Sequence, residues 1–127
     1  MSAKRTLHPT ETDWQRTICE ALTLYGWHWN HVRRSVARRG KDGKPDQWMT
    51  TTSAKGWPDL MALRGEWLLV VEVKGEKTPF GREQIDWLRR FSQLPGSRVW
   101  VLRPLDPWEG ICFWLQHPDK APTRYGW

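Results

Sequence analysis

Few cysteines and the absence of any long apolar run exclude several classes of protein for this chain. Its 127 residues include two cysteines, Cys19 and Cys112, whose separation matches no metal-binding or redox motif. No apolar stretch approaches the roughly 20 residues that a membrane-spanning helix needs. The first residues, 1–7, lack the apolar centre of a secretion signal. We therefore expect a cytoplasmic protein with reduced cysteines.

Two kinds of catalytic apparatus are also missing from the sequence. It contains neither a glycine-rich nucleotide-binding loop nor a Gly-x-Ser-x-Gly segment, so neither an ATP-driven enzyme nor a serine-nucleophile hydrolase is supported. The four histidines form no ligand set with the cysteines. His28 and His31 are a weak candidate metal pair, although ordinary polar roles are more common for such residues.

Acidic residues are fewer than basic ones, which favours an anionic partner. The formal net charge is +6 and the sequence pI is about 9.7. Glycines and a proline punctuate a basic segment that we expect to form a loop over about residues 37–56. The cations in and just before it are Arg33, Arg34, Arg38, Arg39, Lys41 and Lys44. They suit a phosphate backbone, but a solvated charge run is an equally good interpretation from charge alone.

The overall composition is that of one globular domain. Hydrophobic residues make up 39% of the chain and charged residues 27%, which argues against disorder of the whole chain. Eleven tryptophans are an unusually high number. We expect most of them to fill the core or the rim of the domain, with stacking on unpaired bases as the alternative use.

Hydrophobic periodicity predicts a small α/β domain with a mixed sheet flanked by helices, in the order α-β-β-β-α-β. Thr10 is a good N-cap for a first helix that ends at Gly26, and a second helix covers about residues 82–93. The strands of this core are expected at 27–36 (an edge strand), 59–63, 67–74 and 99–102, and a last strand is expected after it at 111–115. The helical crossover between the strands at 67–74 and 99–102 favours parallel pairing of those two. Residues 1–9 are expected to be a disordered lead, 10–116 the domain, and 117–127 an irregular tail.

The tight turn at 64–66 makes the strands at 59–63 and 67–74 a hairpin, which brings two acids together. Folding about this turn places Asp59 opposite roughly residues 70–72, next to Glu72. Because side chains alternate along a strand, Glu72 and Lys74 point to the same face. A carboxylate and an ammonium on a mostly apolar strand are costly unless they pair or hold a ligand.

These residues suit metal-dependent phosphodiester hydrolysis. We expect Asp59 and Glu72 to bind Mg²⁺, or alternatively Mn²⁺, with the Val73 carbonyl as a further candidate ligand. Lys74 would orient the attacking water or stabilise charge on the phosphate. Two helical residues complete the set: Glu11, which binds the ion directly or through water, and Gln84, which bonds the water or a phosphate. An isolated Pro-Asp or Glu-x-Lys is weak, and a surface ion pair is its ordinary explanation, so the joint pattern carries the prediction.

The chain resembles the VRR-NUC domain, a branch of the PD-(D/E)XK nuclease superfamily found in bacteria and bacteriophages. The matching segments are Thr10–Gln15 with Gly26-Trp27, Gly56-Trp57-Pro58-Asp59-Leu60, Val71-Glu72-Val73-Lys74, Thr78-Pro79, Glu83-Gln84, Trp87-Leu88 and Val99–Pro104. They occur in the expected order, although the loop at 77–83 is slightly long for the family.

The resemblance implies a restriction-endonuclease-like core and metal-dependent DNA endonuclease activity. It identifies Asp59, Glu72 and Lys74 as the catalytic trio, with Glu11 and Gln84 in support. Small members resemble Holliday-junction resolvases, which implies branched DNA as a candidate substrate and a homodimer as a candidate assembly. Lys55 and Gln15 join the basic segment as candidate DNA contacts. The alternatives are a non-catalytic nucleic-acid-binding module with the same fold, and an interaction protein whose tryptophans form a partner surface.

Overall fold

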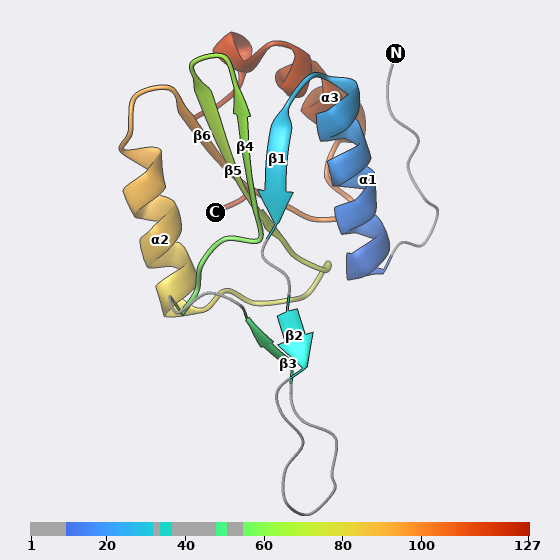
Figure 1. The fold of residues 1–127 in the computed structure, drawn as a ribbon, viewed down its shortest axis with the longest axis vertical. Helices are drawn as coiled ribbons and strands as arrows, with labels where there is room; N and C mark the ends of the chain where they lie inside the picture. The colour runs from blue at the N-terminus through green and yellow to red at the C-terminus, as the bar shows by residue number, and fades with distance from the viewer. Residues whose placement is uncertain (1–9, 32–33, 37–47, 51–54) are drawn as a thin grey trace, which may run out of the picture.

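The computed structural model describes residues 10–31, 34–36, 48–50 and 55–127, and for 34–36 and 48–50 it describes the backbone alone. Three α-helices flank a mixed sheet (Figure 1). The helices are α1 (Glu11–Leu24), α2 (Arg82–Ser92) and α3 (Trp108–Gln116), and a short 3-10 helix, η1, covers Pro118–Lys120. The strands are β1 (His28–His31), β2 (Arg34–Val36), β3 (Trp48–Thr50), β4 (Leu60–Arg64), β5 (Trp67–Val73), β6 (Ser97–Leu102) and β7 (Arg124–Tyr125).

The main sheet has the strand order β1-β4-β5-β6-β7, with β5 at its centre. β4 pairs antiparallel with both of its neighbours, β1 and β5, whereas β6 pairs parallel to β5 and β7 parallel to β6. The expected hairpin and the expected parallel crossover through α2 are both confirmed. β5 is apolar along most of its length because both of its faces are covered.

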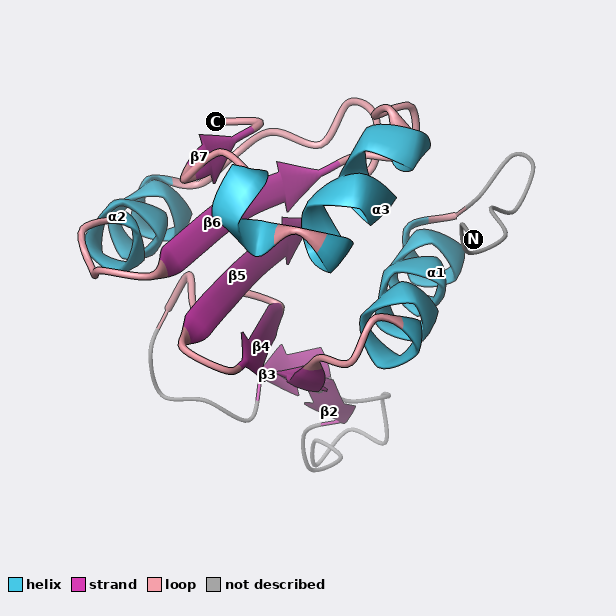
Figure 2. Ribbon diagram, turned by 90° about the horizontal axis from the view of Figure 1, so that it is seen from above, coloured by secondary structure: helices cyan, strands magenta, loops and turns pink. Residues whose placement is uncertain are grey.

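Helices cover the two faces of the sheet unequally, as Figure 2 shows. On one face, α1 and α3 pack over the odd-numbered residues of β5, such as Leu69 and Val71. On the other face, α2 places Leu88 against Val70 and Val99. Even-numbered β5 residues therefore face α2, and this parity decides where Glu72 points.

The first helix forms as the sequence predicts. The Thr10 hydroxyl accepts from the Asp13 backbone N–H at 3.0 Å, and the Asp13 carboxylate accepts in return from the Thr10 N–H. Trp14, inside the core, donates its indole N–H to the Leu102 carbonyl at 3.1 Å. Three other tryptophans are also buried, namely Trp27, Trp100 and Trp108, in agreement with the expected role in packing.

Two expectations about the C-terminal part are wrong. Residues 111–115, expected to be a strand, belong to α3, because the apolar run uses the helical spacing of Trp108, Ile111, Cys112 and Leu115 to cover the sheet. The tail at 117–127 is not irregular. It contains η1 and adds β7 to the free edge of β6, where Val99 is paired with Arg124.

The expected edge strand at 27–36 and the expected basic loop at 37–56 also need correction. β1 is indeed at the edge of the main sheet, but β2 turns away from it and pairs with β3 in a separate two-stranded sheet, with Ser35 opposite Met49 (Figure 1). The region expected to be a loop thus contains the short strand β3, which the glycines around it gave no reason to expect. The lead at 1–9 lies outside the described residues. No helix in the described part of the chain is both long and apolar enough to cross a bilayer.

Candidate functional site

The two acids singled out in the sequence meet at the open end of the hairpin. Leu60 pairs with Val71, so Asp59, one residue earlier, lies beside Glu72. The Val73 backbone N–H donates to the Asp59 Oδ2 at 2.8 Å, which fixes the Asp59 carboxylate against the end of β5. The predicted convergence of these carboxylates is therefore confirmed.

Glu72 is buried in a way that an isolated carboxylate does not tolerate. Its side chain is 2% exposed, and its Oε2 has no hydrogen-bond partner among the described residues. The pKa of Glu72 is raised to about 9, chiefly by burial and then by the charge and hydrogen bonding of Asp59, while Lys74 opposes the change. An unsatisfied buried oxygen beside a second acid is an arrangement that a bound cation or a proton relieves.

Gln84 connects the acid to the lysine. From the first turn of α2, its Nε2 donates to the Glu72 Oε1 at 3.2 Å, and its Oε1 accepts from the Lys74 Nζ at 3.0 Å. The same Oε1 accepts from the Gly81 backbone N–H at 2.8 Å, so the amide also caps its own helix. Lys74 is 7% exposed. The structure thus brings together four of the predicted site residues on the α2 face of the sheet, namely Asp59, Glu72, Lys74 and Gln84.

Glu11 lies at the periphery of this group. It is exposed at the start of α1, the helix on the opposite face, although its charge contributes to the raised pKa of Glu72. A Cβ placed on Gly75, directly after Lys74, would lie 3.8 Å from the Glu11 Oε2. Among the described residues, no three His, Cys, Asp or Glu side chains are grouped closely enough to hold a metal ion together. Asp59 and Glu72 are therefore a pair, and participation of Glu11 stays a prediction.

The segment before Asp59 is fastened to α2 by contacts that the sequence analysis missed. The Trp87 indole N–H donates to the Lys55 carbonyl at 3.1 Å, and the rings of Trp57 and Trp87 meet edge-on with centroids 4.8 Å apart. Gly56, at φ +81°, approaches α2 so closely that a Cβ there would lie 2.6 Å from the Glu83 carbonyl carbon. We name residues 55–58 with Trp87 the α2 clamp. It fixes Asp59 relative to Gln84.

The loop between β5 and α2 has an anchor of its own. The Arg103 guanidinium, after β6, donates to the carbonyls of Gly75 and Thr78. It also lies 5.4 Å from the Phe80 ring centroid, and the Lys74 Nζ lies 5.8 Å from the same centroid. Arg103 therefore holds the loop that joins Lys74 to Gln84. This role of Arg103 follows only from its contacts with Gly75 and Thr78, since nothing in the sequence around Arg103 indicates it.

Most of the candidate DNA contacts fall outside what the structure describes. Arg33, Arg38, Arg39, Lys41 and Lys44 lie outside the described residues, and for Arg34 only the backbone is described. Lys55 is exposed and pairs with Glu83 at 3.5 Å. Gln15 is half-buried on α1. Their predicted contacts with DNA are untested.

Comparisons with known proteins assign no family. No family model matches the chain, and no curated protein or solved structure matches it either.

Proposed function

We propose that this chain is a divalent-metal-dependent nuclease that hydrolyses phosphodiester bonds in DNA. The observation that carries the proposal is the pair formed by half-buried Asp59 and buried Glu72. Among the described residues the Glu72 Oε2 has no hydrogen-bond partner, and the Lys74 ammonium follows directly after the end of β5. Two converging carboxylates repel each other when both are ionised, and a divalent cation removes that repulsion. The neighbouring lysine supplies a positive charge for an anionic substrate.

The donor chemistry fits magnesium, with manganese as the alternative. Asp59 and Glu72 would hold the ion through oxygen ligands, which both ions accept, and the Val73 carbonyl and Glu11 are further candidates. When bound, such an ion supplies Lewis-acid activation of water and neutralises phosphate charge. The residues supply the rest of the chemistry.

Lys74 and Gln84 would act on the phosphate and the attacking water. The Lys74 ammonium is held in one direction by the Gln84 Oε1, so it is pre-positioned to stabilise the negative charge that develops on the phosphate oxygens. The Gln84 Nε2, bonded to the Glu72 Oε1, keeps that carboxylate oriented. Burial of this strand end excludes bulk water and strengthens these interactions.

The fold supports the same proposal at a coarser level. A helix, a β-hairpin, a second helix and a strand parallel to the second hairpin strand follow one another in α1, β4–β5, α2 and β6. This order is compatible with the restriction-endonuclease-like core that the VRR-NUC resemblance implies. We extend the proposal to structure-selective cleavage of branched DNA, and to a homodimer, on the resemblance alone.

Cleavage of a panel of labelled linear and branched DNAs tests the proposal. We expect purified protein to cleave with Mg²⁺ or Mn²⁺ and to be inactive with chelator. Asp59→Asn keeps an acceptor for the Val73 N–H but loses the charge, so it should lower cleavage by at least about 10³-fold while folding is retained. Asp119→Asn, at an exposed position of η1, is the matched control and should cleave normally.

Two outcomes would contradict the assignment. Full activity in Asp59→Asn, or cleavage that persists in chelator, would remove the acidic pair from the chemistry. DNA binding without cleavage by the wild-type protein under any metal condition would instead favour the non-catalytic binding module.

A further inference from the structure

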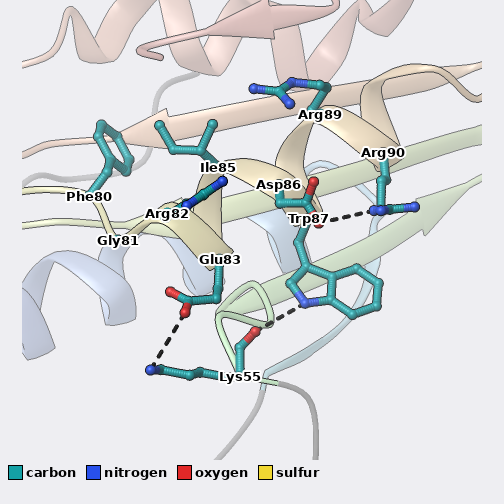
Figure 3. Close-up of a pocket in the computed structure, with 10 residues that line it drawn as sticks. All are labelled: Lys55, Phe80, Gly81, Arg82, Glu83, Ile85, Asp86, Trp87, Arg89 and Arg90. Carbon is teal, nitrogen blue, oxygen red and sulfur yellow. Dashed lines mark hydrogen bonds and ion pairs between the residues drawn. The ribbon is translucent and has the colours of Figure 1, made fainter.

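A charged groove runs along α2, beside the acidic pair, and no part of the proposed chemistry uses it. It encloses about 1200 Å³ and is lined by α2, by the loop that precedes it and by Lys55 (Figure 3). Its charged lining residues are Lys55, Arg82, Arg89, Arg90, Glu83 and Asp86, a net charge of +2. The groove therefore carries a positive charge on a helix that also supplies Gln84.

The two acids of the groove are neutralised by its own cations. Glu83 pairs with Lys55 at 3.5 Å, and Asp86 pairs with Arg90 at 3.1 Å. Among the described residues, neither Arg82 nor Arg89 is within ion-pairing distance of an acid. Both are exposed. Two guanidinium groups thus remain available for an external anion.

The spacing of these two arginines suits a repeating anion. Arg82 and Arg89 are seven residues apart, so they lie on the same face of α2, about 10 Å apart along its axis. That separation is about three steps of a nucleic-acid strand, whose phosphates advance by about 3.4 Å each along a duplex. Arginine binds phosphate oxygens with two parallel hydrogen bonds, which a single lysine cannot do.

Two residues that line the groove also contact the residues around the acidic pair. Gly81 lines it, and its N–H bonds the same Gln84 oxygen that holds Lys74. Phe80 lines it too, and its ring lies 5.8 Å from the Lys74 Nζ. A strand whose scissile phosphate lies at Lys74 would therefore reach the first turn of α2 within a short distance.

We propose that the α2 groove binds the sugar–phosphate backbone of the nucleic-acid strand on one side of the cleaved bond, through Arg82 and Arg89. This inference deepens the proposed nuclease function and rests on it for the identity of the strand. Binding is separable from cleavage, because neither arginine touches Asp59, Glu72 or Lys74 in any contact that the described residues make.

The test is the salt dependence of DNA affinity, measured with chelator so that no cleavage occurs. We compare duplex and single-stranded DNA of one sequence between about 50 and 200 mM salt. The double variant Arg82→Gln/Arg89→Gln should bind at least about tenfold more weakly at low salt. Its slope of log affinity against log salt should be shallower by about 1.8 on duplex or about 1.4 on single strands, as expected for two lost phosphate contacts.

Two further variants make the result specific. Arg82→Lys/Arg89→Lys keeps both charges and should keep most of the slope. Arg16→Gln/Lys120→Gln removes two exposed charges outside the groove, on α1 and η1, and should bind like the wild type. Thermal unfolding of each variant verifies that the fold is retained.

The possible results distinguish failure of the groove proposal from failure of the nuclease proposal. An unchanged slope in Arg82→Gln/Arg89→Gln, an equal loss in the Arg16→Gln/Lys120→Gln control, or a wild-type protein that binds no DNA would overturn it. A wild-type protein that never cleaves DNA, combined with a slope reduced only in the groove variant, would overturn the nuclease proposal and retain the groove as a nucleic-acid-binding surface.

Discussion

Glu72 combines three properties that rarely occur together in one residue: burial, a nearby acid and an oxygen without a hydrogen-bond partner among the described residues. Without a cation, the folded protein keeps Glu72 protonated well above the ordinary carboxyl pKa. Folded-state protonation and metal binding therefore compete for the same oxygens. Both consequences are measurable at this single residue.

The first prediction concerns stability against pH. The folded pKa of Glu72, about 9, lies above its ordinary value of 4.5, so its stabilising contribution is complete below about pH 4.5 and is lost as the pH rises toward 9. In chelator, we expect the melting temperature to fall by several degrees between about pH 5 and pH 9. Differential scanning calorimetry of Glu72→Gln, which cannot ionise, should show a much flatter profile. Equal slopes for the variant and the wild type would contradict the burial of a protonated Glu72.

The second prediction concerns Lys74. Its ammonium is oriented by Gln84. Under the proposed function it stabilises the charge that develops on the phosphate, so Lys74→Ala should lower kcat by about 10²–10³-fold and leave KM within a few-fold. Lys77→Ala, an exposed lysine of the following loop, is the control and should change neither constant. A rise in KM with kcat unchanged would make Lys74 a phosphate clamp instead.

The positions of the site residues on the hairpin could be predicted from the sequence. The residues that hold the neighbouring segments in place could not. Strand alternation and one tight turn were enough to bring Asp59, Glu72 and Lys74 together. The roles of Trp87 and Arg103 depend on contacts between segments far apart in the chain, and no local pattern encodes such contacts.

At the scale of elements, the predictions that rest on strong local signals are confirmed, and those without such signals are wrong or missing. The first helix has a good N-cap, the hairpin has a tight turn and α2 has a helical periodicity, and all three form as expected. The apolar run in α3 is short enough to indicate a strand, and this prediction is wrong because its buried positions repeat at helical spacing. β7 has two residues and exists because β6 offers a free parallel edge, which is a property of the sheet rather than of the segment.

The third prediction tests the α2 clamp as a link between two elements. Gly56 and Gly26 have nearly the same backbone conformation, with φ of +81° and +83°, but a Cβ meets α2 only at Gly56, since none of the atoms around Gly26 lies within 4 Å of it. Gly56→Ala should therefore destabilise the protein more than Gly26→Ala, by at least about 1 kcal/mol beyond the shared strain. Cleavage by Gly56→Ala should also fall, because the clamp positions Asp59 against Gln84.

Chemical denaturation of the two glycine variants measures the first effect, and single-turnover cleavage measures the second. If both variants lose equal stability, the close approach of Gly56 to α2 contributes nothing to the free energy of unfolding. If Gly56→Ala loses stability and keeps full cleavage at a temperature where it is folded, the clamp supports the fold without positioning the site.

At the scale of the whole molecule, the net charge of +6 is divided between segments of different kinds. The groove on α2 carries Arg82 and Arg89 on a rigid helix beside the acidic pair. Arg38 and Arg39 belong to the basic segment, in a different part of the chain, and these two residues lie outside the described ones. A protein that holds a nucleic acid over one site gains when separate surfaces bind separate phosphates, because their counterion-release contributions add.

The fourth prediction is that additivity. Arg38→Gln/Arg39→Gln alone should weaken DNA binding and flatten its salt dependence, and combination with Arg82→Gln/Arg89→Gln should give the sum of the two slope changes, since independent contacts do not share a phosphate. Fluorescence anisotropy titrations of the two double variants and the fourfold variant in chelator provide the comparison. A fourfold variant no worse than either double variant would mean that both segments compete for the same phosphates. An unchanged slope in Arg38→Gln/Arg39→Gln would mean that the basic segment is a solvated charge run and that α2 alone positions the strand.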